Sequence, residues 1–103
     1  MEPVELPLAC SLTAAEQSDR AAEFRELARR SLVDRRRKPG LVVLTFRPTP
    51  GVAEQVHDLA RRERECCPFL RLSVQRSGGL VALSIGAGPD ADAVLDAFYE
   101  LAV

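Results

Sequence analysis

The chain has 103 residues, enough for one domain with a modest core, and its 47% hydrophobic and 28% charged residues are the balance of a globular protein. Its formal net charge is -1, so acids match the basic residues and no overall positive field attracts nucleic acid. We therefore expect a single domain over residues 1–103, and the charge balance disfavours a nucleic-acid partner.

The N-terminal residues carry acids and a proline instead of the basic and apolar regions of a secretory signal. No apolar run approaches the ~18 residues that a membrane span needs, so we expect a cytoplasmic protein without membrane contact. In a reducing cytoplasm, a set of 3 cysteines suits metal binding or redox chemistry better than a structural disulfide. The alternative is that all the cysteines are small buried hydrophobes.

The first half of the chain begins with a strand pattern followed by a helix pattern. A strand is predicted over residues 4–12, and residues 13–16 match a capping box, which predicts the start of a helix. Spacings of three and four give this helix an inward face, and its arginines, Arg20 among them, are assigned to the wet face. The inward residues are Ala21, Phe24, Leu27, Ala28 and Leu32.

A basic run and a buried strand follow this helix. Residues 34–40 are interpreted as a solvated connector, with a nucleic-acid patch as the alternative. Residues 41–46 form a continuous β-branched and aromatic run, which is typical of a central strand buried on both faces.

The second half predicts a helix over residues 51–66, a β-hairpin over residues 70–85 and a last helix after Pro89. The predicted order is βαβαββα. It corresponds to an α+β fold in which a four-stranded sheet packs against helices, arranged as a permuted ferredoxin-like sandwich.

Two adjacent cysteines stand at the C-terminal end of the second predicted helix. Pro68 ends this helix and pushes Cys67 toward extended backbone, so Cys66 and Cys67 occupy a helix-to-strand corner. The C-terminus of a helix carries partial negative charge and opposes thiolate formation, so this corner does not by itself create an activated nucleophile. A bound soft cation would deprotonate the thiols outright, which favours a ligand role.

Helical periodicity places Glu63 on the inward stripe, three and four residues before the two thiols. Glu63 is interpreted either as part of the site or as an acid that reaches solvent or pairs with an arginine of the first helix. Cys67 should project near the centre of the stripe and Cys66 at its edge. His57, the single histidine, projects away from the stripe and is expected at the surface.

The candidate metal ligands are Cys10, Cys66 and Cys67, with Glu63 and Glu65 as weak or outer ligands. Cys10 is the natural third thiol, because its predicted strand-to-helix corner could face the corner at the other two cysteines. Two thiolates and a carboxylate suit zinc when a further ligand arrives, whereas copper(I), mercury(II) and cadmium tolerate fewer ligands and prefer sulfur. The identity of the metal stays open.

The chain resembles a group of small, largely uncharacterised bacterial proteins with a cysteine just before the first helix and a Glu-Cys-Cys-small-Phe motif before a terminal hairpin and helix. The matching residues are Cys10 and then Glu65, Cys66, Cys67, Pro68 and Phe69. Such proteins are associated with heavy-metal regulators of the mercury-responsive type, so the resemblance implies handling of a soft metal. The sequence shows no helix-turn-helix pattern, so we do not expect it to be such a regulator itself.

The leading hypothesis is a soft-metal-binding protein that acts as a buffer, carrier or sensor module. One alternative is a thiol-dependent enzyme for redox chemistry or carbon–metal bond cleavage, in which one cysteine attacks, the other resolves and Glu63 transfers a proton. Another is an interaction module without chemistry, such as a homodimer joined through a strand edge. The sequence contains no Ser-His-Asp set and no phosphate-binding glycine loop, which argues against most hydrolases, kinases and dinucleotide enzymes.

Overall fold

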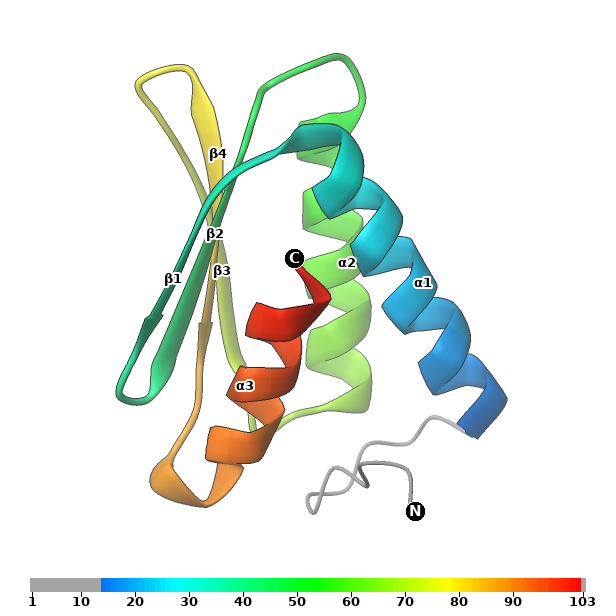
Figure 1. Cartoon of the computed structure of the whole chain (residues 1–103), viewed down its shortest axis with the longest axis vertical. Helices are drawn as coiled ribbons and strands as arrows, with labels where there is room; N and C mark the ends of the chain where they lie inside the picture. Colours follow the sequence, from blue (N-terminus) through cyan, green and yellow to red (C-terminus); the bar gives the residue numbers. More distant parts are fainter. Residues whose placement is uncertain (1–13, 103) are drawn as a thin grey trace.

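The computed structural model describes residues 14–102, which form three α-helices on one side of a four-stranded antiparallel sheet (Figure 1). The elements in chain order are α1 (Ala14–Ser31), β1 (Leu32–Lys38), β2 (Leu41–Phe46), α2 (Val52–Cys66), β3 (Arg71–Ser77), β4 (Leu80–Gly86), the 3-10 turn η1 (Pro89–Ala91) and α3 (Asp92–Leu101).

The sheet order is β1-β2-β4-β3, and each pair of neighbours is antiparallel. Strands β2 and β3 therefore run parallel to each other with β4 between them, and α2 makes the crossover that joins them. This split βαβ unit has β4, the hairpin partner of β3, between its two parallel strands and β1, the hairpin partner of β2, at the outer edge, which is the arrangement of a ferredoxin-like sandwich with permuted connections. The predicted α+β class with a four-stranded sheet packed against helices is confirmed.

The element order differs from the prediction in the first half of the chain. The strand predicted over residues 4–12 lies outside the described residues, and the basic run interpreted as a connector forms most of β1. Pro39 and Gly40 make a two-residue hairpin turn that pairs Lys38 with Leu41, and Gly40 adopts a φ of 72°, which glycine tolerates. The order of the described elements is therefore αββαββα.

Strand β1 directs two arginines toward the helices. Arg35 lies 4.0 Å from the ring centroid of Tyr99 and donates a hydrogen bond to the Tyr99 carbonyl oxygen at 2.7 Å. Arg37 pairs with Asp92 at 3.1 Å and with Asp96 at 3.0 Å, both on α3. These two arginines therefore dock α3 on β1, so they do not belong to a solvated turn or an open basic patch.

The main core lies between the sheet and the helices. Helix α2 packs over β3 and β4, α3 packs over β1 and β2, and α1 lies outside them in contact with α3 and β1 (Figure 1). Alternate residues of the central strands are fully buried beneath the helices, namely Val42, Leu44, Phe46, Val81, Leu83 and Ile85.

Of the inward residues that the periodicity of α1 predicts, Phe24, Leu27 and Ala28 are buried, whereas Ala21 is only half-buried and Leu32 is half-buried and begins β1. The Phe24 ring meets the Phe98 ring of α3 edge-on, with 5.4 Å between the centroids. None of the helices formed by residues 14–102 is long and apolar enough to cross a membrane.

Candidate metal centre

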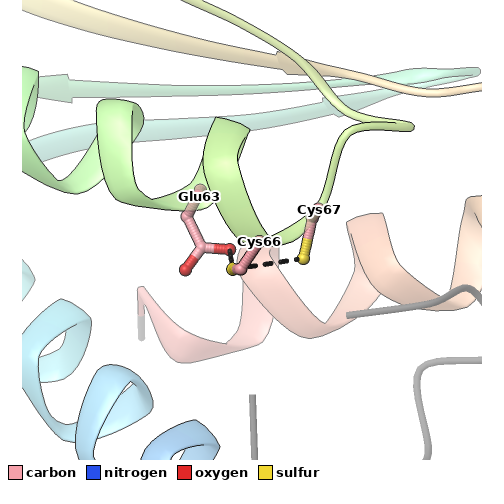
Figure 2. A group of neighbouring side chains, drawn as sticks. All are labelled: Glu63, Cys66 and Cys67. Atoms are coloured by element: carbon pink, nitrogen blue, oxygen red, sulfur yellow. Dashed lines mark hydrogen bonds between the residues drawn. The ribbon is translucent and has the colours of Figure 1, made fainter. Parts of the chain in front are cut away.

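Glu63, Cys66 and Cys67 meet at the C-terminal end of α2 (Figure 2). One sulfur or carboxylate oxygen from each residue lies within 4.8 Å of the others. All three residues are buried, with exposed fractions of 4%, 6% and 1%. We call this group the thiol–carboxylate cluster.

The cluster is the polar end of the apolar stripe of α2. The stripe repeats at alternating intervals of four and three residues and comprises Val52, Val56, Leu59, Glu63 and Cys66, all of them buried. Residues at this spacing lie on one face of the helix, and this face packs inward. Glu63 and Cys66 are therefore buried because of their positions on α2.

Pro68 determines how the second thiol is presented. The helix ends at Cys66, and the Cys67 backbone N–H donates a closing hydrogen bond to the Glu63 carbonyl oxygen at 2.7 Å. Cys67 has left helical geometry, as expected for a residue before proline, but its φ of -129° and ψ of 73° fall short of the extended backbone that the sequence predicts. This change of direction directs the Cys67 side chain back toward Cys66.

The two sulfurs are close but not bonded to each other. The Cys66 and Cys67 Sγ atoms are 3.6 Å apart, far beyond the ~2.05 Å of a disulfide. The Cys66 Sγ also lies 3.9 Å from the Glu63 Oε2 atom. Two sulfurs and one carboxylate oxygen therefore lie within 4.8 Å of one another, a set of donors that could hold a metal ion.

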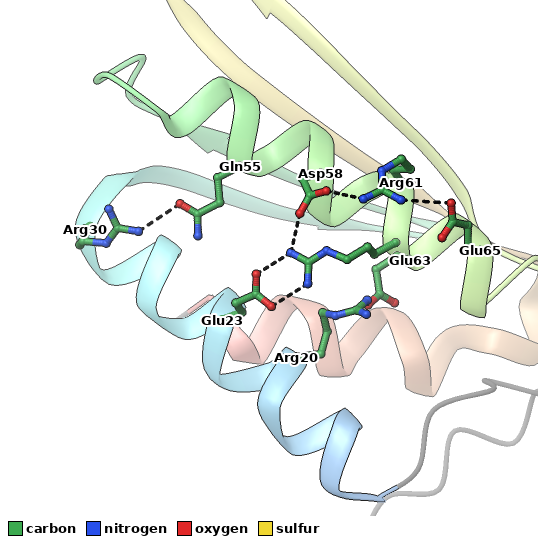
Figure 3. A network of polar contacts seen from close by, with 9 residues as sticks. Arg20, Glu23, Arg30, Gln55, Asp58, Arg61, Glu63 and Glu65 are labelled. Atoms are coloured by element: carbon green, nitrogen blue, oxygen red, sulfur yellow. Dashed lines mark hydrogen bonds and ion pairs between the residues drawn. The ribbon is translucent and has the colours of Figure 1, made fainter.

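The second oxygen of Glu63 is held by an arginine of α1. The Arg20 Nη1 atom lies 2.5 Å from Glu63 Oε1, and the two side chains are only 14% and 6% exposed (Figure 3). A buried carboxylate without a partner costs several kcal/mol, so this ion pair is what permits Glu63 to sit among apolar side chains. Glu63 thus combines both interpretations of it, because it pairs with an arginine of α1 and also lies beside the thiols.

Arg20 corrects the expectation that the arginines of α1 are all wet. It precedes Phe24 by four residues and Leu27 by seven, so it shares their face of the helix. The periodicity that predicts the apolar face of α1 also places Arg20 on that face. The expectation of an exposed Arg20 rests only on its charge.

Beyond Arg20, α1 and α2 are joined by a row of polar contacts, which we call the polar seam (Figure 3). Arg62 donates to both carboxylate oxygens of Glu23, at 2.8 and 2.5 Å, and also contacts Asp58 at 2.8 Å. Arg30 donates to Gln55 at 3.1 Å. The hydrogen bonds from Arg62 hold the pKa of Glu23 below its ordinary value, and the pKa of Arg62 is raised in return.

The predicted site residues separate into three groups. Cys66, Cys67 and Glu63 come together, whereas Cys10 lies outside the described residues. Glu65 does not join the cluster, because it points away from the stripe, is 66% exposed in its side chain and pairs with Arg61 at 3.2 Å. Two residues advance a helix by about 200°, which explains why Glu63 and Glu65 face opposite ways. His57 is exposed, as predicted.

Fold and site together define a small α+β protein with a buried cluster of two thiols and a carboxylate. No family model matches the chain, and no curated protein or solved structure is significantly similar to it.

Proposed function

We propose that this protein binds a soft metal ion in the cytoplasm, as a buffer, carrier or sensor module, and that Cys66 and Cys67 are its thiolate ligands. The observation that carries the proposal is the convergence of two sulfurs and a carboxylate oxygen within 4.8 Å at one buried place. Soft cations prefer thiolate sulfur over the oxygen and nitrogen ligands that dominate elsewhere in the chain.

Metal binding would also offset the unfavourable electrostatic environment of thiolates at Cys66 and Cys67. The end of α2 disfavours a lone thiolate, whereas a coordinated cation deprotonates its thiols outright. Glu63 supplies an oxygen at the same point, and we propose Cys10 as a further sulfur ligand. The resemblance of the Glu65-to-Phe69 motif to that of proteins associated with mercury-responsive regulators favours the same function.

The test is a titration of the reduced protein with zinc, cadmium, mercury(II) and copper(I), followed by native mass spectrometry. We expect one ion per chain with better than micromolar affinity for at least one of these metals, and weaker binding in Cys66→Ser and in Cys67→Ser. Cys10→Ser tests the third thiol separately. The proposal fails when the reduced protein takes up none of the metals at one equivalent.

A thiol-dependent reaction is the second candidate, and the 3.9 Å approach of Glu63 Oε2 to Cys66 Sγ favours it, since this carboxylate could accept the thiol proton. Such an enzyme needs at least one activated thiol. Measuring the rate of alkylation against pH separates the candidates. A thiol pKa well below about 8.5 supports the enzyme, and values at or above it for both cysteines argue against it.

A further inference from the structure

We infer that the cluster accepts a divalent, four-coordinate cation of the zinc and cadmium class, with Glu63 Oε2 as an oxygen ligand and Arg20 as the residue that positions and neutralises that carboxylate. This inference rests on the proposed function and adds the class of ion and the contribution of α1.

The separation of the sulfurs indicates the coordination geometry. Two thiolates at ~2.3 Å from a zinc ion and 3.6 Å from each other subtend an angle of about 100° at the metal, close to the tetrahedral value. A linear two-sulfur site with bonds of similar length would need the sulfurs about 4.6 Å apart, roughly 1 Å farther than they are. The corner at Cys66 and Cys67 therefore fits a bent S–metal–S unit.

The position of the carboxylate agrees with this geometry. Glu63 Oε2 is 3.9 Å from Cys66 Sγ, and an oxygen at ~2.1 Å from the same ion would subtend an angle of about 125° with that sulfur. Carboxylate oxygen is an ordinary ligand for zinc and a poor one for copper(I), whose affinity depends on soft donors. The Glu63 oxygen, as the third ligand, therefore also favours an ion of the zinc and cadmium class.

The local charge is balanced by a divalent ion. Among the described residues, Arg20 and Glu63 cancel each other at the cluster, the neighbouring Arg62 is matched by Glu23, and Asp58 is shared between Arg61 and Arg62. The thiolates of Cys66 and Cys67 then give the cluster two negative charges, once their protons have passed to solvent. A divalent cation neutralises these two thiolates, whereas a monovalent cation leaves one negative charge uncompensated in a buried place, which is costly. A thiolate from Cys10 would add one negative charge in both cases, so the divalent cation would still leave the smaller uncompensated charge.

Arg20 determines which oxygen of Glu63 is available to the ion. Its bond to Oε1 fixes the carboxylate so that Oε2 faces Cys66, as hydrogen-bond partners commonly orient metal ligands. Arg20 is therefore a positioning residue, and it connects the proposed ion to α1.

X-ray absorption spectroscopy of the cadmium- or zinc-loaded wild-type protein tests the geometry directly. We expect at least two sulfur neighbours together with an oxygen neighbour. A linear shell of two sulfurs without oxygen overturns the inference. In Arg20→Met the oxygen shell should weaken, and in Arg20→Lys it should persist; an unchanged shell in Arg20→Met refutes the role of Arg20.

Affinity measurements test the charge argument, with Glu65→Gln as the matched control for Glu63→Gln. In Glu63→Gln the cluster carries one negative charge fewer and loses a charged oxygen ligand, so the ratio of cadmium to copper(I) affinity should fall by at least about tenfold, which is the loss that removing even a hydrogen-bond partner of a ligand commonly causes. Glu65→Gln should leave the ratio unchanged. Adding Arg20→Met to Glu63→Gln restores the original charge and should raise the ratio again. An unaltered ratio in Glu63→Gln, or no recovery in the double variant, contradicts the argument.

The outcomes separate this inference from the function on which it rests. Absence of any metal uptake defeats the proposed function. If the protein binds metal through sulfur alone, and if Glu63→Gln does not change the ratio of cadmium to copper(I) affinity, the proposed function stands and the inference is wrong. The wild-type spectrum decides the geometry even when a variant fails to fold.

Discussion

At the level of single residues, the ion pair between Arg20 and Glu63 is the most deeply buried ion pair in the described part of the protein, with side chains 14% and 6% exposed. Glu63 is 4% exposed and occupies a stripe position that the rest of α2 fills with apolar side chains. Breaking a buried ion pair by removing one partner leaves a desolvated charge behind.

We therefore predict that Arg20→Met lowers the free energy of unfolding of the metal-free protein by about 3 kcal/mol, because Glu63 loses its only described cationic partner. Urea denaturation at neutral pH measures this. Arg29→Met is the control, since Arg29 is 71% exposed in its side chain and should cost less than about 0.5 kcal/mol. Equal effects of the two substitutions would show that the Arg20 pair contributes nothing special.

The pair of Glu23 and Arg62 predicts a pH dependence. Hydrogen bonding to Arg62 lowers the pKa of Glu23 from its ordinary value of 4.5, so its stabilising contribution is present above that pH and is lost as the pH falls below it. Glu23→Gln should therefore destabilise the protein at neutral pH, and this effect should diminish progressively as the pH falls below 4.5 and through the lowered pKa of Glu23. Unfolding curves at several pH values check this, and a difference that stays constant across the range would contradict it.

Helical periodicity predicts much of the site before any tertiary structure is known. It places Glu63 on the inward stripe beside the two cysteines, and Pro68 predicts that Cys67 leaves helical geometry, although Cys67, with ψ 73°, does not reach the predicted extended backbone. It does not identify Arg20 as the partner of Glu63, because 43 residues separate them and only the packing of α1 on α2 joins them. Glu65 is predicted as a weak or outer ligand because it is close to the thiols in sequence. The helix turns by about 200° between Glu63 and Glu65, so the Glu65 side chain lies on the opposite face from the cluster.

At the level of elements, strand β1 shows why a fold can be predicted in class and missed in detail. Strand prediction depends on alternation of apolar and polar side chains, and β1 alternates between charged residues that face α3 and charged residues that face away. Its Pro39-Gly40 turn and its apolar partner β2 were the available signals. The hairpin β3–β4 was predicted well, because its alternation is apolar and its turn is rich in glycine.

The two faces of β1 offer a matched comparison. Arg35 stacks on Tyr99 and donates to the carbonyl of that residue near the end of α3, where the helix dipole favours a cation. We expect Arg35→Gln to lower the free energy of unfolding by about 1–2 kcal/mol. Arg36→Gln, the next residue and on the opposite face, should change it by less than about 0.5 kcal/mol. Thermal unfolding of both variants measures the contrast, and an equal loss would argue that β1 is not docked on α3 through Arg35.

At the scale of the whole molecule, the Arg20–Glu63 pair and the polar seam connect α1 to α2 along most of the length of α2. The apolar core accounts for the packing of α2 and α3 on the sheet, whereas α1 is joined to α2 through ion pairs and hydrogen bonds (Figure 3). An ion bound by Glu63 and the two thiols would therefore strengthen the contact between these helices as well as the corner itself.

The central claim is that the native fold assembles the metal site, beyond what two adjacent cysteines provide in an unfolded chain. A ligand that prefers the native state stabilises it by RT ln(1 + [L]/Kd), about 2.7 kcal/mol at one hundred times the dissociation constant. Binding to the unfolded chain would cancel this gain.

Thermal unfolding of the reduced protein across a series of cadmium concentrations therefore tests the account most directly. For a domain of 103 residues, 2.7 kcal/mol corresponds to a rise in Tm of roughly 10 °C or more. We predict such a rise in the wild type, its reversal by a chelator and its loss in the Cys66→Ser/Cys67→Ser double variant. A Tm that does not change with cadmium, or that rises equally in the double variant, would contradict a native site at Glu63, Cys66 and Cys67.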